Sequence, residues 1–261
     1  MTSRTDWKAL AEAVRAVARP GGAEWLDRAV LDIVIEPERV RTAFPAVTRE
    51  VGSAGLGGAW SDWTADDGGR AMLLHAVGDA FDGEIGDLYR FGDTAERRGV
   101  LRSLDVLGPS ASGGALVRDA LRTNDPQLVV AALGHFGVSC LTHAERDHGV
   151  MKCVFMEVPL VLVPAATAAP RPELSRMLAG FVVERVTAGR AVHPDVWPLI
   201  DANPPTGELD AVLAMTSSDV PERAAAARAA LALRSRATSN AGSEGIAGRG
   251  VADLAPDDVA G

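Results

Sequence analysis

Two histidines and two carboxylates lie within six residues of the chain, in the segment His143-Ala144-Glu145-Arg146-Asp147-His148. Imidazoles and carboxylates bind metals and transfer protons at neutral pH. A helical zinc-protease motif needs histidines four residues apart, whereas His143 and His148 are five apart and point about 140° from each other on a helix. They are therefore weak candidates for a metal site, with no distant third ligand. The alternative is a polar helix start whose carboxylates lie near the positive end of the helix dipole.

A second group of side chains is a candidate binding groove. Ionisable residues crowd around the single tyrosine in residues 88–98, and more follow in residues 121–125 and at Lys152. If the helices that carry them stack, these side chains line a groove for an anionic group. The ordinary alternative is that they cap helices and form interhelical ion pairs. The groove candidates are Tyr89, Arg90, Arg97, Arg122, Asn124 and Lys152.

Signature motifs of common enzymes are absent from the sequence. It contains no G-x-S-x-G motif, no P-loop ending in G-K-[ST] and no G-x-G-x-x-G turn. We assign no catalytic residue and no cofactor, and we favour a protein that is not an enzyme. Glycine pairs are interpreted as helix breakers instead of phosphate loops; they are Gly21-Gly22, Gly57-Gly58, Gly68-Gly69 and Gly113-Gly114.

Composition narrows the class of protein. The chain has 261 residues, a net charge of -9 and a hydrophobic fraction of 47%, with 5% aromatic residues. An acidic surface repels nucleic acid, and an apolar fraction drawn mainly from Ala, Leu and Val favours packed helices. The N-terminus lacks the apolar core of a signal peptide, and charges and prolines interrupt the longest apolar stretch, residues 150–169. We expect a cytoplasmic protein with no nucleic-acid partner and no membrane insertion.

Apolar residues recur every three or four positions, which predicts a nearly all-helical chain. Predicted helices are separated by short turns, which place neighbours antiparallel, so we expect stacked helical hairpins resembling a HEAT-like α-solenoid. Residues 52–69 are expected to form a surface loop anchored by Trp60 and Trp63. Asp93 and Glu96 have the spacing of a capping box, and Pro126 suits a first helical position.

Three regions are predicted along the chain. Residues 1–202 form the helical domain, and residues 203–236 form a linker plus one Ala- and Arg-rich helix. Residues 237–261 contain almost no large apolar side chains and are expected to be a disordered tail.

Four motifs, taken in order, resemble the EboA family of bacterial metabolite-traffic proteins, with similarity over roughly residues 5 to 200. The motifs are the run from Tyr89 to Arg102, the run from Asp119 to Asp125, the run from Gly149 to Leu160, and the pair Leu174 to Leu178 and Glu184 to Arg190.

The resemblance implies a helical protein encoded beside a UbiA-like prenyltransferase, TIM-barrel proteins and a dehydroquinate-synthase-like protein, in clusters linked to making or moving a secondary metabolite. It implies no catalytic residues. Two functions remain open. The first is a non-catalytic adaptor or small-molecule carrier, whose partners are a metabolite or the products of the neighbouring genes. The second is an enzyme using acid-base groups of the groove on a prenylated, sugar-like or phenolic metabolite.

Overall fold

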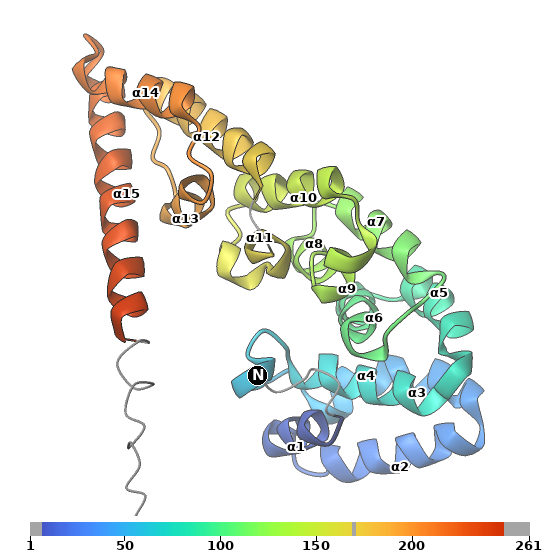
Figure 1. The fold of residues 1–261 in the computed structure, drawn as a ribbon. Helices are drawn as coiled ribbons and strands as arrows, with labels where there is room; N and C mark the ends of the chain where they lie inside the picture. The colour runs from blue at the N-terminus through green and yellow to red at the C-terminus, as the bar shows by residue number, and fades with distance from the viewer. Residues whose placement is uncertain (1–6, 169–170, 248–261) are drawn as a thin grey trace, which may run out of the picture. The chain divides into compact units, whose positions relative to one another are not determined.

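The computed structural model describes residues 7–168 and 171–247, and the elements of these residues are helices joined by loops (Figure 1). The chain divides into two compact units, Met1–Ala168 and Ala169–Gly261. No β-strand occurs in the described ranges, where the one bridge outside helices joins Gly55 to Thr64. The predicted all-helical class is confirmed. No helix of the described residues is both long enough and apolar enough to cross a lipid bilayer.

The first unit begins with helices packed around α4. Helix α4 (Ala65–Val77) contacts α1 (Trp7–Val17), α2 (Gly22–Ile35), α3 (Val40–Val51) and, most extensively, α6 (Thr94–Leu107). Helix α5 (Phe81–Phe91) connects α4 to α6 in sequence. Ten of the thirteen residues of α4 are buried, so this helix is the centre of the unit's core.

The remaining helices of the first unit are shorter. They are α7 (Gly113–Arg122), α8 (Pro126–Ala132), α9 (His135–Cys140), α10 (His143–Phe155) and α11 (Pro164–Thr167). Helix α8 packs on both α6 and α7 and is buried along most of its length. Asp125 caps it, and Pro126 occupies its first position, as predicted.

The second unit contains α12 (Pro172–Thr187), α13 (Trp197–Asp201), α14 (Thr206–Ala214) and α15 (Pro221–Ala247). Helix α12 packs on α13, α14 and α15. The region predicted as a linker plus one helix therefore includes the additional helix α14. Helix α15 continues past Arg236, where the sequence analysis ended it, to Ala247. The rest of the predicted tail, residues 248–261, lies outside the described residues.

The loop after α3 is shorter than predicted. Trp60 and Trp63 are 3% and 1% exposed, so the two indoles do anchor it. The loop nevertheless ends at Thr64, where a capping box formed by Thr64 and Asp67 begins α4. Gly68 and Gly69 therefore lie inside a helix, and the interpretation of this pair as a helix breaker was wrong. Both glycines are buried, and a Cβ on either would press against side chains of Val14 or Val47.

Candidate functional site

Charged residues are buried at the start of α4. Asp66, Asp67 and Arg70 are each 1% exposed, on one face of the first two helical turns. Charged side chains are almost never buried to this extent unless they are paired. Their partners come from α6, where Arg98 and Arg102 are one turn apart. Together with Asp62 from the preceding loop, these residues form what we call the acid-arginine cluster: Asp62, Asp66, Asp67, Arg70, Arg98 and Arg102.

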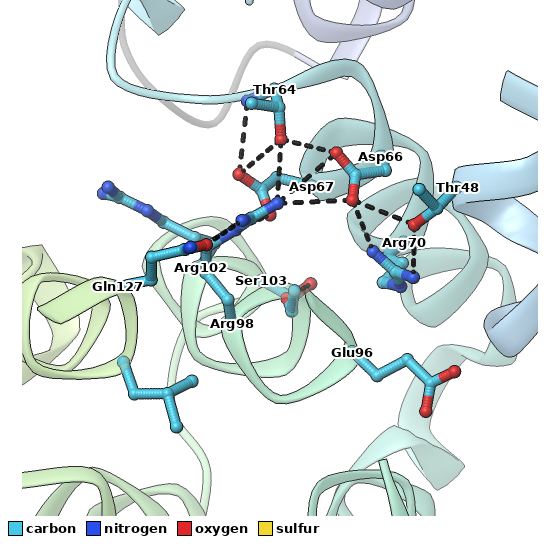
Figure 2. Close-up of polar contacts among 12 residues, drawn as sticks. Thr48, Thr64, Asp66, Asp67, Arg70, Glu96, Arg98, Arg102, Ser103 and Gln127 are labelled. Atoms are coloured by element: carbon cyan, nitrogen blue, oxygen red, sulfur yellow. Dashed lines mark hydrogen bonds and ion pairs between the residues drawn. The ribbon is translucent and has the colours of Figure 1, made fainter. Parts of the chain in front are cut away.

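Arg98 and Arg70 share the carboxylate of Asp66 (Figure 2). Arg70 Nη1 donates to Asp66 Oδ2 over 2.9 Å, and Arg98 Nη2 lies 3.2 Å from the same oxygen. Arg98 Nε also donates to Asp67 Oδ1 over 2.8 Å. Thr48 from α3 and Thr64 add hydroxyl hydrogen bonds to Asp66. Three segments of the unit, α3, α4 and α6, therefore meet through one buried carboxylate.

Neighbouring groups of the cluster keep Asp66 and Arg98 charged. Burial by itself would raise the pKa of Asp66, but the hydroxyl of Thr64 and the guanidinium groups of Arg98 and Arg70 outweigh it, and the pKa lies below its ordinary value. Burial opposes the charge of Arg98 as well, yet the carboxylates of Asp67 and Asp66 raise its pKa. The cluster is thus a set of fixed ion pairs.

Arg102 extends the cluster towards the surface. Its Nη1 donates to Asp62 Oδ2 over 2.8 Å and its Nη2 donates to the Asp62 carbonyl over 3.2 Å. At the other side, Arg98 Nη1 donates to Oε1 of Gln127, at the start of α8. These two contacts hold the guanidinium groups at the edge of a pocket.

The pocket has a volume of about 430 Å³ and combines one polar wall with one apolar wall. We call it the acid-arginine pocket. Its polar wall is made of Asp62, Thr64, Asp67, Arg98, Arg102 and Gln127. Its other lining residues, mostly apolar, are Pro126, Val130, Met156, Glu157, Val158, Pro159 and Leu162. Pockets of this size with apolar walls and a few fixed polar groups are typical of small-molecule sites.

Glu157 in this lining has an unusual backbone conformation. Its φ is 56°, and it is the non-glycine residue with positive φ among the described residues. The left-handed region is uncommon for a side chain other than Asn, Asp or Gly, and strained residues of this kind gather at functional sites. Because α10 ends at Phe155, this turn directs the following residues, 158–162, along the pocket.

Two of the six predicted groove residues, Tyr89 and Arg97, have structural roles. The Tyr89 hydroxyl is 3.1 Å from Asp119 Oδ2, and burial followed by the charge of Asp119 raises the pKa of Tyr89. Arg97 lies over the Tyr89 ring and donates to the carbonyls of Gly92 and Arg90. Arg97 therefore caps the end of α5, while the Arg90 side chain is exposed.

Two other groove candidates, Arg122 and Lys152, do line a hollow. Arg122 and Lys152 line a space of about 270 Å³ together with Arg118, Leu121, Glu145, His148 and Gly149. Lys152 Nζ donates to the Leu121 carbonyl over 3.0 Å, near the end of α7. Tyr89, Arg90, Arg97 and Asn124 are not part of this lining. The six candidates therefore do not share one groove, although Arg122 and Lys152 do share a hollow.

The two histidines lie on one helix, α10, as the interpretation of that segment as a polar helix start assumed. His143 is its first residue and contacts Arg146 through Nδ1. His148 lines the hollow beside Lys152. Glu145 instead completes a capping box with Thr142 and pairs with Arg118 Nε at 2.7 Å. These bonds, led by the one from Arg118, lower the pKa of Glu145 to about 2. Among the described residues, no group of three or more His, Cys, Asp and Glu side chains is arranged to hold a metal ion.

Sequence reasoning missed the acid-arginine cluster. Asp66 and Arg70 are four residues apart, as are Arg98 and Arg102, a spacing that places each pair on one face of a helix. That signal was lost because residues 52–69 were assigned to a loop. Arg98 lay in the stretch singled out for its charges, but it was not among the groove candidates.

The chain was compared with known proteins at three levels. A family model described as "Metabolite traffic protein EboA" matches residues 54–201, which include every residue of the acid-arginine pocket. No curated protein and no solved structure matches the chain.

Proposed function

Because the chain belongs to the EboA family of metabolite traffic proteins, we propose that it is a non-catalytic carrier that binds a small metabolite in the acid-arginine pocket. The observation that carries the proposal is the contrast between the two walls of this pocket. A cluster of buried ion pairs lines the same pocket as the apolar side chains of Val130, Met156 and Leu162. Fixed polar groups orient a ligand, and the apolar wall supplies most of the affinity.

The ionisation of the cluster supports binding over acid-base catalysis. A general acid or base is most effective when its pKa lies near the working pH. Asp66 is held deprotonated by two guanidinium groups, with a pKa below its ordinary range. Asp67 and Asp62 each accept a charge-assisted hydrogen bond of 2.8 Å from an arginine. Such carboxylates hold geometry well but transfer protons poorly.

Further parts of the proposal concern the scaffold and its setting. We picture the helices as a stack of antiparallel hairpins within a domain covering residues 1–202, in a cytoplasmic protein. The hollow at Arg122 and Lys152 is a second candidate surface, where an anionic group of the metabolite or a protein encoded by a neighbouring gene would bind. Binding of such a protein here would make the chain an adaptor as well as a carrier.

Native mass spectrometry of the protein isolated from its own host tests the proposal. We expect a bound metabolite that is retained by the wild-type chain and lost in Met156→Trp, since the indole would fill the pocket. A matched control is Ala43→Trp, because Ala43 lines a different pocket of about the same volume, 430 Å³, on α2 and α3. This control should retain the metabolite.

Two outcomes would redirect the proposal. If Met156→Trp keeps the metabolite and the double variant Arg122→Ala/Lys152→Ala loses it, the binding site is the hollow beside α10. If the purified protein converts the bound metabolite into another compound, the protein is an enzyme, and the carrier proposal is wrong.

A further inference from the structure

The charges that line the acid-arginine pocket restrict the kind of ligand it accepts. Its arginines are Arg98 and Arg102, and its acids are Asp62, Asp67 and Glu157. Arg98 is paired with Asp67 at 2.8 Å and Arg102 with Asp62 at 2.8 Å. Glu157 has no ion-pair partner in the part of the chain that the structure describes, and its side chain is exposed. The lining therefore has one negative charge in excess and no unpaired cation.

An anionic ligand fits this lining poorly. A phosphate or carboxylate would have to share a guanidinium whose charge an aspartate already balances, and it would add a second negative charge to a lining that already has one in excess. If a guanidinium left its aspartate instead, Asp67, which is 1% exposed, would remain a buried, poorly compensated charge. A cationic ligand would gain little binding free energy from its charge. Its best partner is the exposed carboxylate of Glu157, and exposed ion pairs contribute weakly.

A hydroxyl group fits the polar wall better than either ion does. Carboxylate oxygens and guanidinium nitrogens alternate there within hydrogen-bond distance of each other, at Asp67 with Arg98 and at Asp62 with Arg102. A hydroxyl both donates and accepts, so it can bind to both members of a pair without separating them. The side chain of Gln127, at the edge of this wall, offers an amide with the same two capacities.

The apolar wall continues beyond the pocket. Met156, Val158, Pro159 and Leu162 line it, and all four belong to the segment that follows α10. The same segment exposes Val161 by 83% and Leu162 by 42% of their surfaces. Large exposed apolar side chains beside a pocket mark a surface on which an apolar group lies.

From this arrangement we infer that the pocket takes an uncharged, hydroxyl-bearing head group attached to an aliphatic chain, with the head on the Asp67-Arg98 and Asp62-Arg102 pairs and the chain along residues 156–162. The inference rests on the proposed carrier function and specifies its ligand class.

Three probes with the same octyl chain test the inference on the full-length protein. They are octyl glucoside, octyl sulfate and octyltrimethylammonium, each titrated by calorimetry below its micellar concentration. We expect one molecule of octyl glucoside to bind per chain, octyl sulfate to bind at least tenfold more weakly, and octyltrimethylammonium to lie between them. Met156→Trp should abolish binding of the glucoside, and Ala43→Trp should leave it unchanged.

The outcomes separate the inference from the carrier proposal. If octyl sulfate binds through the pocket as tightly as the glucoside, the inference is overturned while the carrier proposal stands. If octyltrimethylammonium binds most tightly of the three probes, the inference is likewise overturned and the carrier proposal stands. If none of the probes binds, or if Met156→Trp binds them as the wild type does, the pocket is not the site and both proposals fail.

A change of charge checks the cause of the selectivity. Asp62→Asn keeps a hydrogen-bond acceptor for Arg102 but removes its counter-charge, so the affinity for octyl sulfate relative to octyl glucoside should rise at least tenfold. Glu157→Gln changes an exposed side chain, so the variant should fold as the wild type does. We expect its affinity for octyl sulfate to rise two- to threefold and its affinity for octyl glucoside to stay unchanged. An unchanged ratio in both variants would overturn the charge argument.

Discussion

At the scale of single residues, the molecule depends on charges that it has removed from water. Asp66 and Arg70 are each 1% exposed and pair at 2.9 Å, one helical turn apart. Arg70 also donates to Thr48 over 2.9 Å and lies over the ring of Phe44. Replacing such a pair by apolar residues is often neutral, but removing one partner leaves the other buried and uncompensated.

Arg70→Met should therefore destabilise the protein severely. Its side chain fills much of the same space, but Asp66 then keeps Arg98 as its one guanidinium partner. We expect the free energy of unfolding to fall by about 3 kcal/mol, at the lower end of the range for broken buried pairs, because Arg98 remains. Urea denaturation followed by circular dichroism measures this change.

The matched control is Arg39→Met, which breaks the pair with Glu36 at 2.8 Å on the surface, where both side chains are about half exposed. Its urea midpoint should stay at the wild-type value. Equal midpoints for Arg70→Met and Arg39→Met would show that the buried cluster does not depend on this pair.

At the scale of elements, the close approach of α4 and α6 allows the cluster to form. Gly99 lies on α6 between Arg98 and Val100 and is buried against the side-chain stem of Arg70. A methyl group there would collide with that stem, which is held at its far end by Asp66 and Thr48. The absence of a side chain at Gly99 thus makes room for the arginine that neutralises Asp66.

Gly99→Ala is expected to destabilise the protein by about 1 to 3 kcal/mol, because overpacking outweighs the gain in helix propensity. Gly86→Ala is the matched substitution in α5, where a Cβ meets nothing within 4 Å. That variant should gain roughly 0.5 to 1 kcal/mol. Thermal unfolding of the two proteins compares them directly, and stabilisation by Gly99→Ala would contradict the packing argument.

Several elements could be predicted because their signals are local. The capping box of Asp93 and Glu96 begins α6 at Thr94, and Pro126 begins α8, both as the sequence indicated. Helices α5, α9 and α14 were missed. Helix α5 contains two glycines, which lower its helix propensity, and α9 has only six residues, too few to show an apolar period. Helix α14 is stabilised by packing on α12.

The candidate site could not be predicted for a different reason. Charged side chains are expected at the surface, so Asp66 and Arg70 gave no sign of burial until α4 was known to be the central helix. The pocket also combines residues 62–67, 98–102, 126–130 and 156–162, and no local pattern connects these segments. Arg122 and Lys152 line one hollow, and Lys152 Nζ donates to the Leu121 carbonyl near the end of α7.

At the scale of the whole molecule, the chain is two compact units, and the proposed function belongs to the first. Every residue that lines the acid-arginine pocket lies between Asp62 and Leu162, inside the unit Met1–Ala168. The family match continues to residue 201, through α12 and α13 of the second unit. The second unit has buried apolar residues of its own, including Leu178, Val182 and Trp197.

A fragment of residues 1–168 is therefore expected to fold without the second unit. Its buried core surrounds α4, and the ion pairs of the acid-arginine cluster all lie within it, so it retains the contacts that stabilise the pocket. We expect a helical circular dichroism spectrum, one cooperative thermal transition, and an affinity for octyl glucoside within threefold of the full-length value. The same fragment carrying Met156→Trp should fold but not bind. A fragment that unfolds would mean that the core of the first unit depends on α12 to α15, and the family match past residue 168 would then reflect a structural requirement shared by both units.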